Sequence, residues 1–107
     1  MKNMTATELR DYLATDVDPL LIDVRESHEL ANGTINGITH IPMNTLPARL
    51  NELEKYKNQT IVVICRAGQR SAQVGQYMEQ MGFRDVINLA SGMNGWATDV
   101  DPSMKVY

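Results

Sequence analysis

Cysteine occurs once in the 107 residues, at position 65. One cysteine cannot form an internal disulfide, and it also excludes a zinc site with several cysteine ligands and a Cys-x-x-Cys redox pair. Positive charge is scarce as well, since 10 lysines and arginines stand against 13 acidic residues and the net charge is −3. Nucleic-acid binding depends on a basic footprint, so we expect no nucleic-acid partner.

Long apolar runs are also absent. No stretch approaches the roughly 20 apolar residues that span a bilayer, so we expect no membrane partner. The first ten residues, MKNMTATELR, lack the apolar region and cleavage site of a secretory signal, and we expect a cytoplasmic protein. His28 and His40 have no metal-ligand arrangement, so we expect no metal and no other cofactor.

The residues that are present fit one globular domain over residues 1–107, with 43% apolar and 21% charged residues. Four short segments are typical of strands: 20–24, 37–42, 60–65 and 85–89. One helical pattern follows a capping box at Thr5 and Glu8. Further helical patterns cover 25–33, 46–53, 71–81 and 91–97. Strands that alternate with helices predict an α/β domain with a mainly parallel sheet flanked by helices on both faces.

Cys65 stands where the clearest of these strands ends. In open parallel sheets, ligands bind beyond the carboxyl ends of the strands. The loop that follows contains Arg66, Gly68 and Arg70, and we expect the next helix to begin at Ser71. Free amides at a helix start, a nest of amides around a glycine, and two guanidinium groups all favour the nucleophilic thiolate.

The alternative is that Cys65 is a small buried apolar residue without a chemical role. Two cations beside an inert buried thiol would lose hydration without gaining a partner, which makes this alternative less favourable. The sequence therefore predicts that Cys65 is a nucleophile.

The motifs around this cysteine occur together in a known family. The loop CRAGQRS (65–71), preceded by a β-branched strand, resembles the active-site loop of rhodanese-type sulfurtransferases. LIDVRESHEL (21–30), GTINGITHIP (33–42) and MGFRDVINLASGMNGW (81–96) resemble further motifs of that family, in the same order. The resemblance covers residues 5–98 and indicates the single-domain, rhodanese-like kind of fold.

The resemblance implies a sulfurtransferase that moves sulfane sulfur from a donor such as thiosulfate to a nucleophilic acceptor. Cys65 is then the catalytic nucleophile and carries a persulfide between the two steps. The implied partners are a small anionic sulfur donor, a thiol or cyanide acceptor and, as an open alternative, a sulfur-relay protein. The expected substrate-binding residues form the rest of the loop: Arg66, Ala67, Gly68, Gln69, Arg70 and Ser71.

Two other functions remain open at this point. Phosphatases and arsenate reductases of the related fold resemble Cys-x5-Arg, whereas this chain has Cys-x4-Arg from Cys65 to Arg70. A module that senses sulfide or docks a partner without catalysis is the second alternative, although such domains often lack the cysteine.

Other residues near this sheet edge have weaker signals. Asp23, Arg25 and Glu26 follow the first predicted strand, and a carboxylate among them would orient one loop arginine. A surface salt bridge of little energetic value is the competing interpretation. We expect Trp96 to pack in the core near the pocket.

Overall fold

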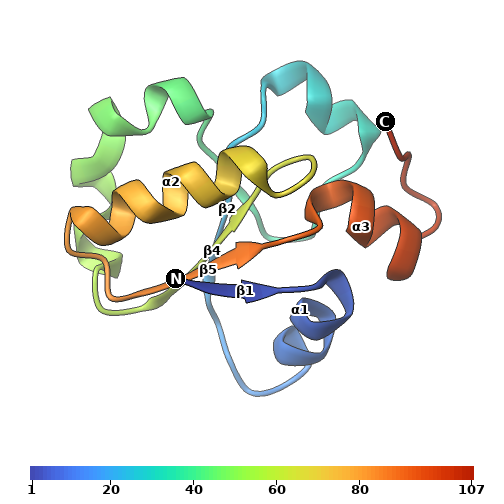
Figure 1. Ribbon diagram of the computed structural model, residues 1–107, viewed down its shortest axis with the longest axis horizontal. Helices are drawn as coiled ribbons and strands as arrows, with labels where there is room; N and C mark the ends of the chain where they lie inside the picture. The colour runs from blue at the N-terminus through green and yellow to red at the C-terminus, as the bar shows by residue number, and fades with distance from the viewer.

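The computed structural model describes residues 1–107 as a five-stranded sheet with helices on both faces (Figure 1). The strands are β1 (Lys2–Met4), β2 (Leu20–Asp23), β3 (Thr39–His40), β4 (Thr60–Ile64) and β5 (Asp85–Leu89). Their order across the sheet is β1-β5-β4-β2-β3, and every neighbouring pair is parallel. The predicted α/β class with a parallel sheet is therefore confirmed.

Two α-helices and three 3₁₀ helices connect these strands, and a third α-helix follows β5. They are α1 (Ala6–Leu13), η1 (Ser27–Asn32), η2 (Met43–Thr45), η3 (Pro47–Tyr56), α2 (Gln69–Gln80) and α3 (Gly92–Asp99). The predicted capping box at the start of α1 is confirmed, because Thr5 Oγ1 accepts the Glu8 amide and Glu8 Oε1 accepts the Thr5 amide. None of the helices combines the length and apolar character needed to cross a membrane.

The structure corrects several predicted elements. The helices expected over 25–33 and 46–53 are 3₁₀ helices that cover 27–32 and 47–56, and the strand expected over 37–42 shortens to β3. Helix α2 begins at Gln69, two residues before the expected start, because Gly68 turns the chain with a φ of +94°. Strand β1 was not predicted, and it forms by pairing with β5.

Side chains of β4 alternate between two hydrophobic clusters, one on each face of the sheet. Ile61 and Val63, with Cys65 directly after the strand, belong to the cluster on the α2 side, whereas Val62 and Ile64 belong to the cluster on the α1 and α3 side. Because β4 is central and both of its faces are covered, its residues from Ile61 to Ile64 are all apolar and buried. This burial fixes the end of β4, and with it the position of Cys65.

Candidate active site

Cys65 directly follows β4 at the carboxyl edge of the sheet, and its side chain is almost completely buried. The chain then turns through Gly68 into α2. The Gly68 amide donates a hydrogen bond to Cys65 Sγ over 3.1 Å. The sulfur therefore lies against the N-terminal end of α2, where unpaired amides and the helix dipole favour negative charge.

The first turn of α3 and the turn before it hold this loop from behind. The Met93 amide donates to the Cys65 carbonyl over 2.8 Å, and the Asn94 amide donates to the Arg66 carbonyl over 3.0 Å. A Cβ atom on Gly68 would collide with the carbonyl oxygen of Ala90. The loop and the turn thus approach so closely that residue 68 must be glycine.

A pocket of about 250 Å³ opens above the sulfur. Its lining residues are Cys65, Arg66, Ala67, Gln69, Arg70 and Asn94. The structure therefore brings most of the predicted site residues around one cavity. Asn94, from the first turn of α3, is an addition that the sequence did not indicate.

The two remaining predicted residues, Gly68 and Ser71, are buried and contact the sulfur from inside the protein. Ser71 Oγ lies 3.2 Å from Cys65 Sγ, and the same hydroxyl donates to Asn88 Oδ1 over 2.5 Å. Asn88 is a polar residue in the middle of the buried strand β5, and only the tertiary structure places it beside Ser71.

Arg70 forms a two-point ion pair with Glu29 of η1, in which Nη1 and Nη2 each lie 2.8 Å from a carboxylate oxygen. The hydrogen bonds from Arg70 outweigh the opposing effect of burial and lower the pKa of Glu29 to about 2. The same contacts raise the pKa of Arg70 above its ordinary value, against the effect of burial. Arg70 is therefore held at the pocket wall as a fixed cation.

The sequence indicated a carboxylate for this role within the segment of Asp23, Arg25 and Glu26. Asp23 instead pairs with Arg25 over 2.8 Å, and both side chains are fully buried. Burial by itself would lower the pKa of Arg25, but its hydrogen bonds to Asp23 and Tyr107 outweigh burial and raise it. Glu29 was missed, although it stands three residues after Glu26 and accepts the Glu26 amide over 2.8 Å, the spacing of a capping box.

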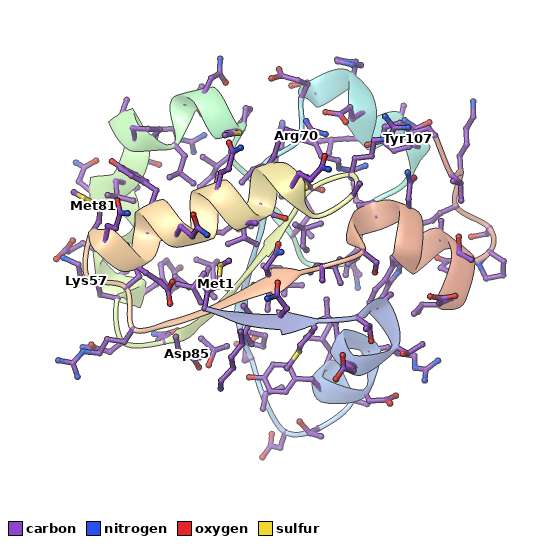
Figure 2. The ribbon with its side chains drawn as sticks, viewed as in Figure 1. Met1, Lys57, Arg70, Met81, Asp85 and Tyr107 are labelled. Atoms are coloured by element: carbon purple, nitrogen blue, oxygen red, sulfur yellow. The ribbon has the colours of Figure 1, made fainter.

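Tyr107 links the cations around the pocket. Its hydroxyl accepts a hydrogen bond from Arg25 Nη1 over 3.1 Å and donates one to Glu29 Oε1 over 2.9 Å. The Arg66 guanidinium lies 5.0 Å from the centre of the Tyr107 ring, within the range of a cation–π contact. Figure 2 shows Arg70 near the start of α2 and Tyr107 near the C-terminus, both in the upper part of the view. Burial raises the pKa of Tyr107.

The remaining candidate residues, His40 and Trp96, make contacts that support the fold. His40 Nε2 lies 2.7 Å from the Arg25 carbonyl oxygen, and no group of three or more His, Cys, Asp or Glu side chains is arranged to hold a metal ion. Trp96 packs in the cluster on the α1 and α3 side, as expected for a core residue, and it does not line the pocket above Cys65.

Comparison with known proteins shows the family and the fold to which this chain is similar. The family model described as "Rhodanese-like domain" matches residues 5–99. A sulfurtransferase from Allochromatium vinosum is 35% identical over 97 residues, which cover 91% of this chain and 89% of the relative. The crystal structure of SSP1007 from Staphylococcus saprophyticus is 39% identical, with a TM-score of 0.83 over 94% of this chain and 97% of that one.

The human single-domain sulfurtransferase TSTD1 is 28% identical to this chain, with a TM-score of 0.76 over 92% of this chain and 97% of that one. The matches extend along nearly the whole length of these single-domain proteins. A cysteine at the end of a central parallel strand, at the start of a helix and beneath a small polar pocket, is thus set in the fold that they share. The chain belongs to the family of rhodanese-like domains.

Proposed function

We propose that this protein is a sulfurtransferase that moves sulfane sulfur from an anionic donor such as thiosulfate to a thiol or cyanide acceptor. The observation that carries the proposal is the position of Cys65 Sγ, at the floor of the pocket and in a hydrogen bond with the Gly68 amide at the start of α2. The names of the single-domain relatives support the same class of reaction.

In the first step, the Cys65 thiolate attacks the outer sulfur of thiosulfate. A bond forms between the two sulfur atoms, the sulfur–sulfur bond of the donor breaks, and sulfite leaves with its electron pair. Cys65 then carries a persulfide whose outer sulfur is negatively charged. The loop amides from Arg66 to Ser71 are proposed to hold this sulfur at the N-terminal end of α2, where an anion is favoured.

In the second step, a thiolate or cyanide ion attacks the outer sulfur of the persulfide. The bond between the two persulfide sulfurs breaks, the electron pair returns to Cys65 Sγ, and the thiolate is regenerated. Division of one transfer into two displacements is the usual advantage of a covalent intermediate. The sulfur of Cys65 is the only carrier that this sequence of steps requires.

The two loop arginines differ in what they offer the donor. Both Nη atoms of Arg70 bind Glu29, whereas the exposed Arg66 forms no ion pair with any carboxylate. We therefore assign capture of the anionic donor mainly to Arg66, with Arg70 as a fixed positive charge beside the sulfur. A guanidinium group suits this task because its planar set of donors matches oxyanion geometry.

The loop also favours sulfur transfer over phosphate chemistry. Only four residues separate Cys65 from Arg70, one fewer than in the phosphatases with Cys-x5-Arg. The shorter loop makes a smaller ring of amides, which suits one sulfur atom better than a tetrahedral oxyanion. The carboxylate of Glu29 already occupies the Arg70 fork that a phosphate ester would need.

Intact mass spectrometry after incubation with thiosulfate tests the proposal. The expected result is the gain of one sulfur atom on the protein, its loss on addition of cyanide, and the release of thiocyanate. The matched control is Cys65→Ser, which should stay folded and gain no sulfur. No mass gain in the folded parent protein with thiosulfate or with a low-molecular-weight persulfide would overturn the proposal and favour a non-catalytic docking module.

A further inference from the structure

The Ser71 side chain lies between the sulfur of Cys65 and an amide of β5. Its hydroxyl oxygen is 3.2 Å from Cys65 Sγ and 2.5 Å from Asn88 Oδ1, and both Ser71 and Asn88 are buried. A serine hydroxyl has a single proton, so it donates only one of these two bonds at a time. If the proton is donated to Asn88, Ser71 is an acceptor toward the sulfur of Cys65, and if it is donated to the sulfur, Ser71 is a donor.

The orientation of the Asn88 amide determines where this proton lies. Asn88 Nδ2 is 3.2 Å from the carbonyl oxygen of Gly68 and 3.0 Å from Asn3 Oδ1. A backbone carbonyl only accepts hydrogen bonds, so the NH₂ end of the amide must face Gly68 and the oxygen end must face Ser71. The Ser71 proton is therefore donated to Asn88, and Ser71 presents a lone pair to Cys65.

This arrangement fits the thiol form of Cys65 better than the thiolate. A thiol donates its S–H to the lone pair of Ser71, whereas a thiolate has no proton to donate. Ionisation of Cys65 thus places two electron-rich atoms 3.2 Å apart unless the Ser71 proton rotates toward the sulfur. That rotation leaves Asn88 Oδ1, a buried acceptor, without its hydrogen bond, which is unfavourable.

We infer that Asn88 is a positioning residue that acts through Ser71 and favours the thiol form of Cys65 while the pocket is empty. The Ser71 hydroxyl turns to the sulfur when negative charge develops there. This step changes no covalent bond in Ser71 or Asn88, and the thiol proton leaves to water or to an incoming base. The only thiol of the chain is therefore less reactive at rest than its loop charges alone would make it.

The hydrogen bonds that run from Asn88 through Ser71 to Cys65 form an uncharged relay. The charged groups near Cys65 are not part of it. Arg66 and Arg70 line the same pocket, and Glu29 pairs with Arg70. The buried Asp23–Arg25 pair lies on the neighbouring strand β2 and just beyond its end. The turn after β5 and the first turn of α3 contribute no charged side chain to the pocket. A substitution at Asn88 leaves all of these charges in place.

The test is the pH dependence of Cys65 alkylation by iodoacetamide, with the ultraviolet absorbance of the thiolate as a second measurement. Asn88→Ala frees the Ser71 proton for the sulfur. A hydrogen bond to a charged group corresponds to roughly one pH unit or more, so we expect the midpoint of thiolate formation to move down by about one unit. Alkylation below the midpoint should then be severalfold faster, because the roughly tenfold larger fraction of thiolate outweighs its lower intrinsic nucleophilicity.

Three further variants make the result decisive. In a Ser71→Ala background, Asn88→Ala should no longer move the profile, because the proton that it releases is gone. Asn3→Ala removes only the second partner of Asn88 Nδ2 and should keep the parent profile. If Asn88→Ala does not fold, Asn88→Val, whose β-branched side chain suits a central strand, should give the same shift.

An unchanged midpoint in a folded Asn88 variant would overturn the inference, and so would a shift of equal size with and without the Ser71 hydroxyl. Neither measurement uses sulfur transfer. The inference can therefore fail while the proposed function stands, and the proposed function can fail while the relay is confirmed.

Discussion

Arg70 and Glu29 are 41 positions apart in the sequence, yet each guanidinium Nη atom lies 2.8 Å from one carboxylate oxygen of Glu29. The pair joins the start of α2 to η1 and closes one side of the pocket above Cys65. Glu29 also accepts the Glu26 amide and the Tyr107 hydroxyl, so four hydrogen bonds converge on one carboxylate. The pair is therefore a fixed part of the pocket wall.

Replacement of Glu29 should change the acid stability of the protein. The pKa of Glu29 is about 2 in the folded state, compared with 4.5 for an unperturbed glutamate side chain. A lowered pKa stabilises the folded state fully above pH 4.5, and that contribution is lost as the pH falls from 4.5 to 2. Glu29→Gln should be less stable at neutral pH and should show a flatter decline across this window.

Urea unfolding at a series of pH values measures this effect. Glu52→Gln is the control, because Glu52 forms an exposed ion pair with Arg49 that should contribute only about 0–1 kcal/mol. Equal pH profiles for the parent and Glu29→Gln would contradict the prediction.

Replacement by alanine should have different effects at the two loop arginines, on stability at one and on KM at the other. Arg70→Ala leaves the buried Glu29 carboxylate without its main partner and should destabilise the fold by about 1–3 kcal/mol. Arg66→Ala removes an exposed side chain that has no ion pair and only the contact with the Tyr107 ring, and it should change stability by about 1 kcal/mol or less. We expect Arg66→Ala instead to raise KM for thiosulfate about tenfold, as expected for the loss of one charged contact.

Thermal melts and steady-state kinetics on the same preparations separate these outcomes. Arg70→Lys should recover only part of the lost stability, because a lysine ammonium cannot form the two-point contact. A large drop in stability for Arg66→Ala together with unchanged kinetics would show that this arginine is structural.

Gly68 offers a matched pair of glycine substitutions. Gly68 and Gly37 have φ values of +94° and +87°, but a Cβ atom on Gly37 would meet nothing within 4 Å. Gly37→Ala should therefore lose only the conformational term of about 1–2 kcal/mol. Gly68→Ala adds a collision with the Ala90 carbonyl and should displace the loop, so that persulfide formation is lost along with more stability.

Intact mass after thiosulfate treatment and denaturant unfolding compare the two variants. Full persulfide formation by Gly68→Ala would mean that the close approach of the loop to the turn at residues 90–92 is not needed for activity.

The hydroxyl of Tyr107 should contribute to stability, and its ring should contribute to binding of the donor. Tyr107→Phe removes the hydrogen bonds to Arg25 and Glu29 but keeps the ring beside Arg66, so it should lower stability by about 1–2 kcal/mol with little effect on KM. Tyr107→Ala also frees Arg66 and should raise KM for the anionic donor. Identical kinetics for the two variants would show that the ring does not position Arg66.

The sequence by itself determined the strand, loop and helix that present Cys65. A β-branched run favours a buried strand, Gly68 permits the turn, and the apolar spacing after it favours a helix, so each of these signals acts between near neighbours in the chain. The capping box of α1 and the predicted loop residues likewise depend on near neighbours in the chain. The fold was therefore predictable, because local preferences and the family motifs agree, and the role of Cys65 as a nucleophile stays a prediction.

The tertiary structure alone decided how polar groups pair around the sulfur. Three contacts join residues that are far apart in the sequence. They are Glu29 with Arg70, Asn88 with Ser71 and Tyr107 with Arg66, at separations of 41, 17 and 41 positions. Strand β1 likewise forms only where β5 offers a free edge. A hydrogen bond between distant residues leaves no periodic trace in the sequence, because its energy depends on where the sheet order brings the two side chains and on how well that place excludes water.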